Sequence, residues 1–242
     1  MMVGAQHGAM LFSLEHRYYG DSQPFDNWST DNLEKGLSSE QALADIATFI
    51  EAQNKDLLGY EADWIVIGGS YPGALSAWFK SQYPDHAVGA WSSSGVIHAI
   101  KDFKTFDLDI FMRTDSSSPD CSNAIKQADT YVQEQFKTSA GTQHLADLFG
   151  ISIPIDQRDF NFYFADIFVT GVQYGNRVGM CADLVAADAD SESLIEAVAK
   201  LASTEGLSYD QYDSASLAKT EIDIDSSLRQ WTFQYCNEFG FF

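Results

Sequence analysis

Short apolar runs and stretches of helical periodicity alternate over the first hundred residues. Three apolar runs have the length of strands and lie at residues 8–15, 64–67 and 88–91. Because helical patterns separate them, the order indicates a parallel sheet with right-handed crossovers. We expect the run at 64–67 to be a strand buried on both faces.

Two helices are predicted between these strands. The first begins with a capping box formed by Ser38 and Gln41, and apolar residues between 43 and 50 then recur on one face. The second spans residues 74–81. Strands joined by helices place the chain in the α/β class.

The pattern becomes mainly helical after residue 97. Residues 125–132 and the aromatic segment 160–174 each predict a helix with a buried face. Ser193 and Glu196 form a further capping box. We therefore divide the chain into an α/β core at 1–97, a helical insertion at 98–228, and a segment returning to the core at 229–242.

The junction of the second strand and the second helix carries the candidate chemistry. Residues 68–73 read Gly-Gly-Ser-Tyr-Pro-Gly, so a buried strand delivers Ser70 onto a tight turn and a helix follows at once. This is similar to the Gly-x-Ser-x-Gly turn of α/β-hydrolases, with Pro72 in the last position and Gly73 one residue later. Such a turn exposes the hydroxyl of Ser70, and the N–H of Tyr71 lies where an oxyanion would form. An ordinary serine in a glycine-rich turn is the alternative.

Charge and composition exclude several partners. The chain has 242 residues with 35 acidic and 14 basic side chains, a net charge of −21, so nucleic acid and anionic membrane surfaces are unsuitable partners. No apolar run is long enough for membrane insertion, and no secretory signal is recognisable at the N-terminus. We find neither metal-ligand spacing nor a cofactor motif. The oligomeric state stays open.

Several motifs together resemble one enzyme family. Residues 15–22 read Glu-His-Arg-Tyr-Tyr-Gly-Asp-Ser, residues 68–78 read Gly-Gly-Ser-Tyr-Pro-Gly-Ala-Leu-Ser-Ala-Trp, and residues 231–240 contain Trp-x-x-Gln-x-Cys-x-Glu-x-Gly. These segments, with the helix at 37–45, resemble the lysosomal prolyl-carboxypeptidase and dipeptidyl-peptidase II family of serine peptidases. The proline in the turn is most similar to the thymus-specific serine protease branch and its plant relatives.

The resemblance implies a serine exopeptidase that acts on peptides, commonly after proline and at acidic pH. It implies Ser70 as the nucleophile, Tyr71 as an oxyanion donor through its N–H, and a helical middle that restricts the site to peptide ends. Ala74, one turn beyond Ser70, is expected to face the substrate pocket. A lysosomal, vesicular or secreted location follows from the same resemblance.

The family's other catalytic residues are absent from these 242 residues. The motifs that carry its aspartate and histidine are not found, so we expect both beyond Phe242 and interpret the chain as a fragment.

His16 precedes Ser70 and is better explained as a structural residue below the active-site loop. We expect Glu15 and Arg17 to form a buried, paired network. His86, His98 and His144 are expected in surface or capping roles.

The three cysteines fit an oxidised protein within this resemblance. A disulfide between Cys121 and Cys181 is expected in the helical middle, with Cys236 pairing outside the chain; three reduced thiols are the alternative. Residues 27–29 form a glycosylation sequon at Asn27.

Two further functions stay open beside the peptidase: an α/β-hydrolase esterase or lipase, and a catalytically inactive truncated product or pseudoenzyme.

Overall fold

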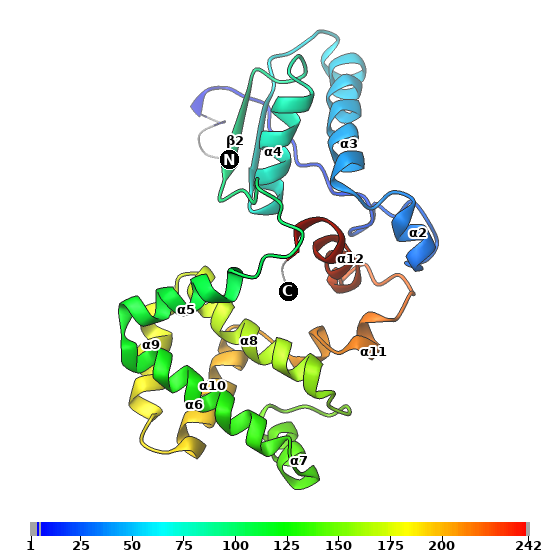
Figure 1. Ribbon diagram of the computed structural model, residues 1–242. Coiled ribbons are helices and arrows are strands. Elements are labelled where there is room, and N and C mark those ends of the chain that lie inside the picture. Colours follow the sequence, from blue (N-terminus) through cyan, green and yellow to red (C-terminus); the bar gives the residue numbers. More distant parts are fainter. Residues whose placement is uncertain (1–3, 5, 241–242) are drawn as a thin grey trace. The chain divides into compact units, whose positions relative to one another are not determined.

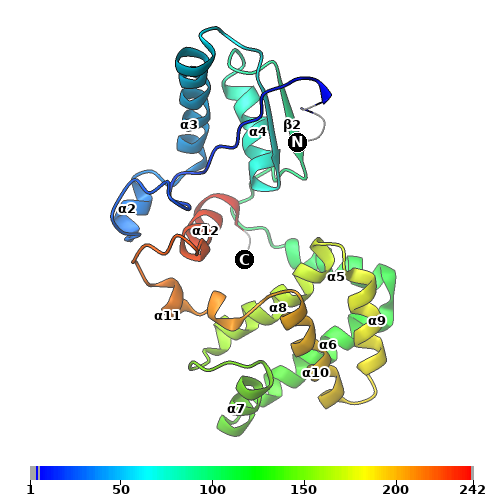
Figure 2. The same ribbon diagram turned by 180° about the vertical axis from the view of Figure 1, so that it is seen from behind.

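The computed structural model describes residues 4 and 6–240, which form two compact units. The first unit combines the residues up to 103 with those from 220 onward, and the second comprises residues 104–219 (Figures 1 and 2). Each unit has its own apolar core.

The first unit contains a parallel two-stranded sheet. Strand β1 (Ile65–Gly69) pairs with β2 (Gly89–Ser93), with Ile65 opposite Gly89 and Gly69 opposite Ser93. Helix α4 (Tyr71–Gln82) connects the two strands and packs against both of them (Figure 1). This strand–helix–strand unit brings the carboxyl ends of both strands to one edge, directly beside the start of α4.

Helix α3 (Ser39–Ala52) packs on α4 and completes this layer. The Ser38 hydroxyl accepts a hydrogen bond from the Gln41 N–H and so caps α3. The predicted apolar face of α3 is buried, and Leu43 lies in one core cluster with Phe79 of α4. A π-helical turn, η1 (Gln53–Leu58), then ends at Gly59, whose φ of 74° suits glycine.

Two expectations for this sheet are wrong. Residues 9–15 are irregular and exposed, because no strand among the described residues lies beside them to share a hydrogen-bond ladder. Phe12 instead packs against Phe49 and Trp64. Residues 65–69 are a strand, but α4 covers only one of its faces. Ile65 and Ile67, on the other face, are 62% and 67% exposed.

A second small core and the returning segment complete the first unit. Helix α2 (Thr30–Glu34) carries Leu33 into a cluster with Tyr18 and Trp28. Near the end of the chain, α12 (Leu228–Gln234) runs into a π-helical turn, η3 (Tyr235–Phe239). Phe239 is buried in the same cluster as α3 and α4. Residues far apart in sequence therefore share the core behind the start of α4.

The second unit is helical and is built around an aromatic-rich core. Its elements are α5 (Phe106–Ser117), α6 (Pro119–Gln135), α7 (Ser139–Leu148), α8 (Gln157–Gln173), α9 (Arg177–Ala187), α10 (Ser191–Thr204), η2 (Tyr209–Gln211) and α11 (Ser214–Leu217). Helix α10 begins earlier than predicted, because Asp190 rather than Ser193 is its N-cap. None of the helices described has the length and apolar character needed to cross a bilayer.

Candidate active site

Ser70 stands between β1 and α4 with a strained backbone. Its φ of 59° and ψ of −123° lie where residues other than glycine are rarely found. The Ser70 N–H donates to the Ser93 carbonyl oxygen at 2.9 Å, and the Ser70 carbonyl accepts the first helical hydrogen bond of α4 from Ala74. The Ser70 residue is exposed. Because the surrounding structure fixes this conformation, the strain identifies a candidate functional position.

Two glycines allow the turn to close. A Cβ atom on Gly68 would lie 2.0 Å from the Pro72 carbonyl oxygen, and one on Gly73 would lie 2.7 Å from the Ser93 carbonyl oxygen. Neither backbone position has room for a larger residue. Pro72 occupies the first turn of α4, where its missing N–H leaves no helical bond unmade. Gly73, one residue later than in the usual motif, thus provides the close contact between helix and strand.

The start of α4 presents backbone amides beside Ser70. The first hydrogen bond inside the helix is donated by the Ala74 N–H, so the amides of Tyr71 and Gly73 precede the helical ladder. These groups carry the partial positive charge of a helix N-terminus. An anion formed next to the Ser70 hydroxyl would therefore be stabilised here, which is the property that acyl transfer requires.

The buried side chain of Tyr71 takes part in a polar network. Its hydroxyl lies 3.0 Å from His16 Nε2, 3.2 Å from Ser39 Oγ and 3.1 Å from Gln234 Nε2. Burial raises the pKa of Tyr71 to about 12. Tyr19, which donates to Gln234 Oε1, also has a pKa raised by burial. Both phenols therefore stay protonated, and they act as neutral hydrogen-bonding groups.

Glu238 extends this network from η3. Its carboxylate accepts from the Ser39 N–H at 2.8 Å and from the Ser39 hydroxyl at 3.0 Å. The sequence alone does not assign Ser39, Gln234 or Glu238 a role at the site. Their signal was present, since all three lie in or next to the segments that carry the family resemblance.

His16 has the structural position that the sequence analysis expects. Its Nδ1 lies 2.7 Å from the Arg17 carbonyl oxygen, and Nε2 faces Tyr71. Burial lowers its pKa, opposed in part by the hydrogen bond to the Arg17 carbonyl and the nearby charge of Asp45. His16 thus supports the residue after Ser70 from behind.

Arg17 and Glu15 do not form the buried network predicted for them. Arg17 makes a two-pronged ion pair with Asp45 of α3, with both N–O distances at 2.6 Å, and this pair is partly exposed. Hydrogen bonding to Asp45 raises the pKa of Arg17 further. Glu15 is exposed and accepts from the Ser22 N–H. The two side chains serve different turns because Arg17 is drawn to the carboxylate on α3.

Among the residues described, no histidine or carboxylate forms a hydrogen bond with Ser70. His86 Nε2 lies 2.9 Å from Glu51 in the first unit, and His144 lies near Tyr131 and Glu192 in the second. His98 is exposed in the segment after β2. The described part of the chain thus places an exposed serine beside helix N-terminal amides, and no histidine or carboxylate among the described residues is bonded to it.

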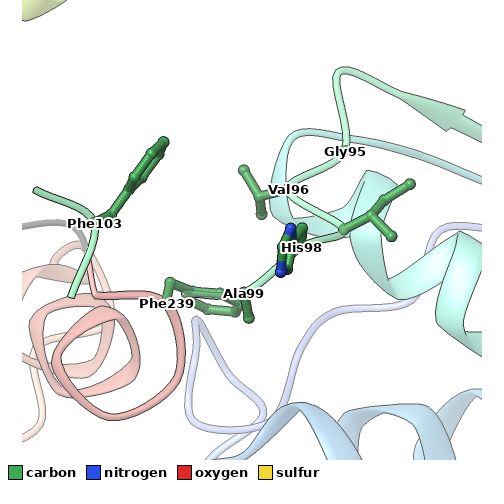
Figure 3. Close-up of a pocket in the computed structure, with 7 residues that line it drawn as sticks. Gly95, Val96, His98, Ala99, Phe103 and Phe239 are labelled. Atoms are coloured by element: carbon green, nitrogen blue, oxygen red, sulfur yellow. The ribbon is translucent and has the colours of Figure 1, made fainter. Parts of the chain in front are cut away.

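Two hollows adjoin the sheet. The larger has a volume of about 620 Å³, and its lining includes Ser70, Tyr71 and His16. Ala74 is completely buried and is not among the residues that line it. The smaller, about 230 Å³, is lined by Gly95–Ala99, Phe103 and Phe239. Figure 3 shows Val96, His98 and Ala99 there, following the carboxyl end of β2.

The cysteines and the predicted glycosylation site, Asn27, lie away from Ser70 in sequence. Cys121 of α6 and Cys181 of α9 are joined by a disulfide inside the second unit, and Cys236 is free and exposed. Asn27 is partly exposed in the turn before α2, and its Nδ2 donates to Asp26 Oδ1. No group of three or more potential metal ligands lies together within the described ranges.

A strand that ends in a strained, exposed serine at the head of a crossover helix is the nucleophile arrangement of the α/β-hydrolases. The chain therefore carries part of an α/β-hydrolase fold together with a helical unit. Residues 1–242 match the family described as serine carboxypeptidase S28, and the chain belongs to this family.

Curated relatives agree with this assignment. The chain is 35% identical over 247 residues to a probable serine protease of Arabidopsis thaliana, an alignment that covers 97% of this chain and 49% of the relative. It is 38% identical over 165 residues to the lysosomal Pro-X carboxypeptidase of Homo sapiens, covering 65% and 33%. With the thymus-specific serine protease of Mus musculus it shares 27% identity over 263 residues, covering 97% and 52%. The chain thus spans about half the length of the relatives that it matches end to end.

Proposed function

We propose that the protein is a serine peptidase in which Ser70 forms an acyl-enzyme. The observation that carries this proposal is the strained backbone of an exposed serine at the start of α4. The Ser70 oxygen attacks a peptide carbonyl, and the carbonyl oxygen becomes an anion that the Tyr71 N–H stabilises. The leaving amine departs with a proton, and water then releases the acyl group from Ser70.

This reaction requires a base that takes the proton from Ser70. No described histidine is bonded to Ser70, and the relatives matched end to end are about twice as long as the chain. We therefore seek the histidine and its aspartate in the full-length protein. Without such a base, serine attack loses several orders of magnitude in rate.

A fluorophosphonate probe tests the nucleophile directly. In the full-length protein, we expect one adduct on Ser70, found by peptide mass spectrometry, and none in a Ser70→Ala variant. Ser76 of the same helix is a matched control, because it is buried and donates to the Gly73 carbonyl. A Ser76→Ala variant should keep the adduct. A folded protein that is not labelled would exclude an activated Ser70 and favour a non-catalytic role.

The substrate class is a finer part of the proposal. Relatives named as carboxypeptidases support peptides as substrates and removal of residues from a peptide end, with preference for a prolyl bond. A peptide series with proline or alanine before the terminal residue, with free or amidated ends, should show faster cleavage of the free-ended proline peptides. Faster turnover of simple acyl esters than of every peptide would instead indicate an esterase.

We further propose a lysosomal, vesicular or secreted location. The disulfide between Cys121 and Cys181 fits an oxidising compartment, and Asn27 lies at an accessible turn within a glycosylation sequon. Several relatives are named as lysosomal. Glycosidase treatment should increase the gel mobility of the natural protein, and an Asn27→Gln variant should lose this change. A protein without glycan and with reduced thiols would contradict the proposed location.

A further inference from the structure

The network around Tyr71 contains several groups whose hydrogen-bonding direction is fixed by chemistry. The Arg17 carbonyl can only accept, so His16 Nδ1 must carry a hydrogen to bond it at 2.7 Å. The Tyr19 hydroxyl donates to Gln234 Oε1, which leaves the Gln234 amide nitrogen to donate to Tyr71. Neutral His16 therefore has no hydrogen on Nε2, and Tyr71 must direct its single O–H there.

The other end of the network then lacks one hydrogen. The Ser39 hydroxyl has a single proton, and it faces both the Tyr71 oxygen at 3.2 Å and Glu238 Oε2 at 3.0 Å. With neutral His16, the Tyr71 proton is used toward His16, so Ser39 can satisfy only one of its two contacts. An unmade hydrogen bond among partly buried polar atoms is costly.

One additional proton on His16 satisfies every contact. Nε2–H then donates to Tyr71, the Tyr71 O–H turns to Ser39 Oγ, and the Ser39 O–H donates to the Glu238 carboxylate. Gln234 continues to donate to Tyr71, and the bond from Nδ1 to the Arg17 carbonyl is unchanged. We infer that His16 is a positioning residue that binds one proton on acidification, reverses its hydrogen bond with Tyr71, completes the chain of hydrogen bonds from Tyr71 through Ser39 to Glu238, and so fixes the residue whose N–H faces the oxyanion.

The charges around His16 act in both directions. Asp45 on α3 and Glu238 on η3 favour the protonated ring, whereas Arg17 on its own segment opposes it. The phenols of Tyr19 and Tyr71, which contact the ring, stay neutral because burial raises their pKa values. Burial is the largest influence, and it lowers the pKa of His16, so the transition falls on the acidic side of an ordinary histidine.

The effect on catalysis rests on the proposed function, because it acts through the Tyr71 amide. The proton itself is measured independently by nuclear magnetic resonance of the full-length protein with isotope-labelled histidine rings. His16 is assigned by its loss in His16→Gln. Its neutral form should be the Nδ1–H tautomer, the opposite of the form that free histidine prefers.

Two variants alter the number of hydrogens needed without touching His16. Ser39→Ala removes the group that lacks a hydrogen, and Glu238→Gln supplies an amide donor to Ser39 at nearly constant shape. In each, neutral His16 satisfies the network, so its titration midpoint should fall by roughly half a pH unit or more. Ser39→Ala leaves every charge in place and so separates hydrogen bonding from the charge of Glu238. Glu51→Gln, beside His86, is the control and should leave the His16 midpoint unchanged.

The rate of fluorophosphonate labelling at Ser70 links the proton to the site. In the wild-type protein a step in this rate should coincide with the His16 midpoint, and in Ser39→Ala both should move together. An Nε2–H tautomer, or a midpoint that does not respond to Ser39→Ala, overturns the inference about the proton. Labelling with no step at the His16 midpoint overturns the positioning role. Absence of labelling at every pH defeats the proposed function, while the resonance titration still decides the question of the proton.

Discussion

The Ser70 N–H donates to the Ser93 carbonyl oxygen at 2.9 Å, and this bond joins the turn at Ser70 to the end of the neighbouring strand. The same carbonyl oxygen would lie 2.7 Å from a Cβ atom on Gly73. The Ser93 carbonyl thus holds Ser70 in place and also limits the size of the residue at position 73. The conformation of the turn is therefore determined by the pairing of β1 with β2 as well as by its own sequence.

Replacement of Gly68 should disrupt the turn, whereas replacement of Gly69 should not. A Cβ atom on Gly68 would overlap the backbone of Pro72, but one on Gly69 would have its nearest neighbour at 3.9 Å. We expect Gly68→Ala to lower the free energy of unfolding by more than about 2 kcal/mol and Gly69→Ala to change it by less than about 1 kcal/mol. Denaturant titration measures both. Equal effects would mean that the close approach at Gly68 is absent in solution.

The strain at Ser70 should be measurable as lost stability. Ser70→Ala and Ser70→Gly both remove the hydroxyl, but only glycine adopts a φ of 59° and a ψ of −123° without a steric penalty. We expect the free energy of unfolding of Ser70→Gly to exceed that of Ser70→Ala by about 1 kcal/mol. Ser70→Gly should therefore melt at a higher temperature in thermal unfolding. Neither variant should react with a fluorophosphonate probe. A less stable glycine variant would show that the turn is unstrained.

The disulfide should stabilise the helical unit. Cys121 and Cys181 are 60 residues apart, so their bond closes a long loop in the unfolded chain. Replacement of both by alanine should lower the free energy of unfolding by about 2–4 kcal/mol. Chemical denaturation followed by circular dichroism measures this loss. Cys236→Ser removes the free thiol and serves as the control, with little change expected; similar losses in both would argue against a specific role of the disulfide.

Asp166 should make the helical unit less stable at neutral pH. Burial, and next the charge of Asp107, raise its pKa, although the hydrogen bond from Tyr212 opposes them. The native state therefore holds this proton more tightly than the unfolded chain, and stability falls as pH rises from about 4 through the raised pKa. Asp166→Asn should raise the melting temperature by a few degrees at pH 7.

The gain from Asp166→Asn should shrink as pH falls toward 4, because both states of the wild-type protein then bind the proton. Asp183→Asn is the matched control: Asp183 is exposed on α9, so its replacement should have little effect at either pH. A gain that is independent of pH would mean that lost charge is not the cause. Thermal melts at several pH values distinguish these outcomes.

The sequence predicts those parts of the site that are local. Gly68, Ser70 and Gly73 lie within six residues, and the close backbone approach there requires small residues that can be recognised in the sequence. The buried faces of α3 and α4 follow from apolar spacing for the same reason. The partners of Tyr71 could not be found in this way, because Gln234 lies 163 residues further along the chain.

The strand predicted at residues 8–15 is wrong for a related reason. An apolar run indicates that a segment packs against something, but pairing depends on a neighbouring strand that the run does not encode. Phe12 does pack, on Phe49 and Trp64, without forming a ladder. Likewise, the sequence predicts a buried, paired network for Glu15 and Arg17 but not the partner Asp45, which lies 28 residues beyond Arg17 on α3.

The interrupted first unit has a consequence for biosynthesis. Tyr71 is translated before the helical unit, whereas its neighbours Gln234 and Phe239 are translated only after that unit is complete. At typical elongation rates the nascent chain waits roughly ten to thirty seconds between these points. During that interval we expect the part of α4 that Phe239 later covers to be unshielded, while residues 104–219 already contain their own apolar core and both cysteines of their disulfide.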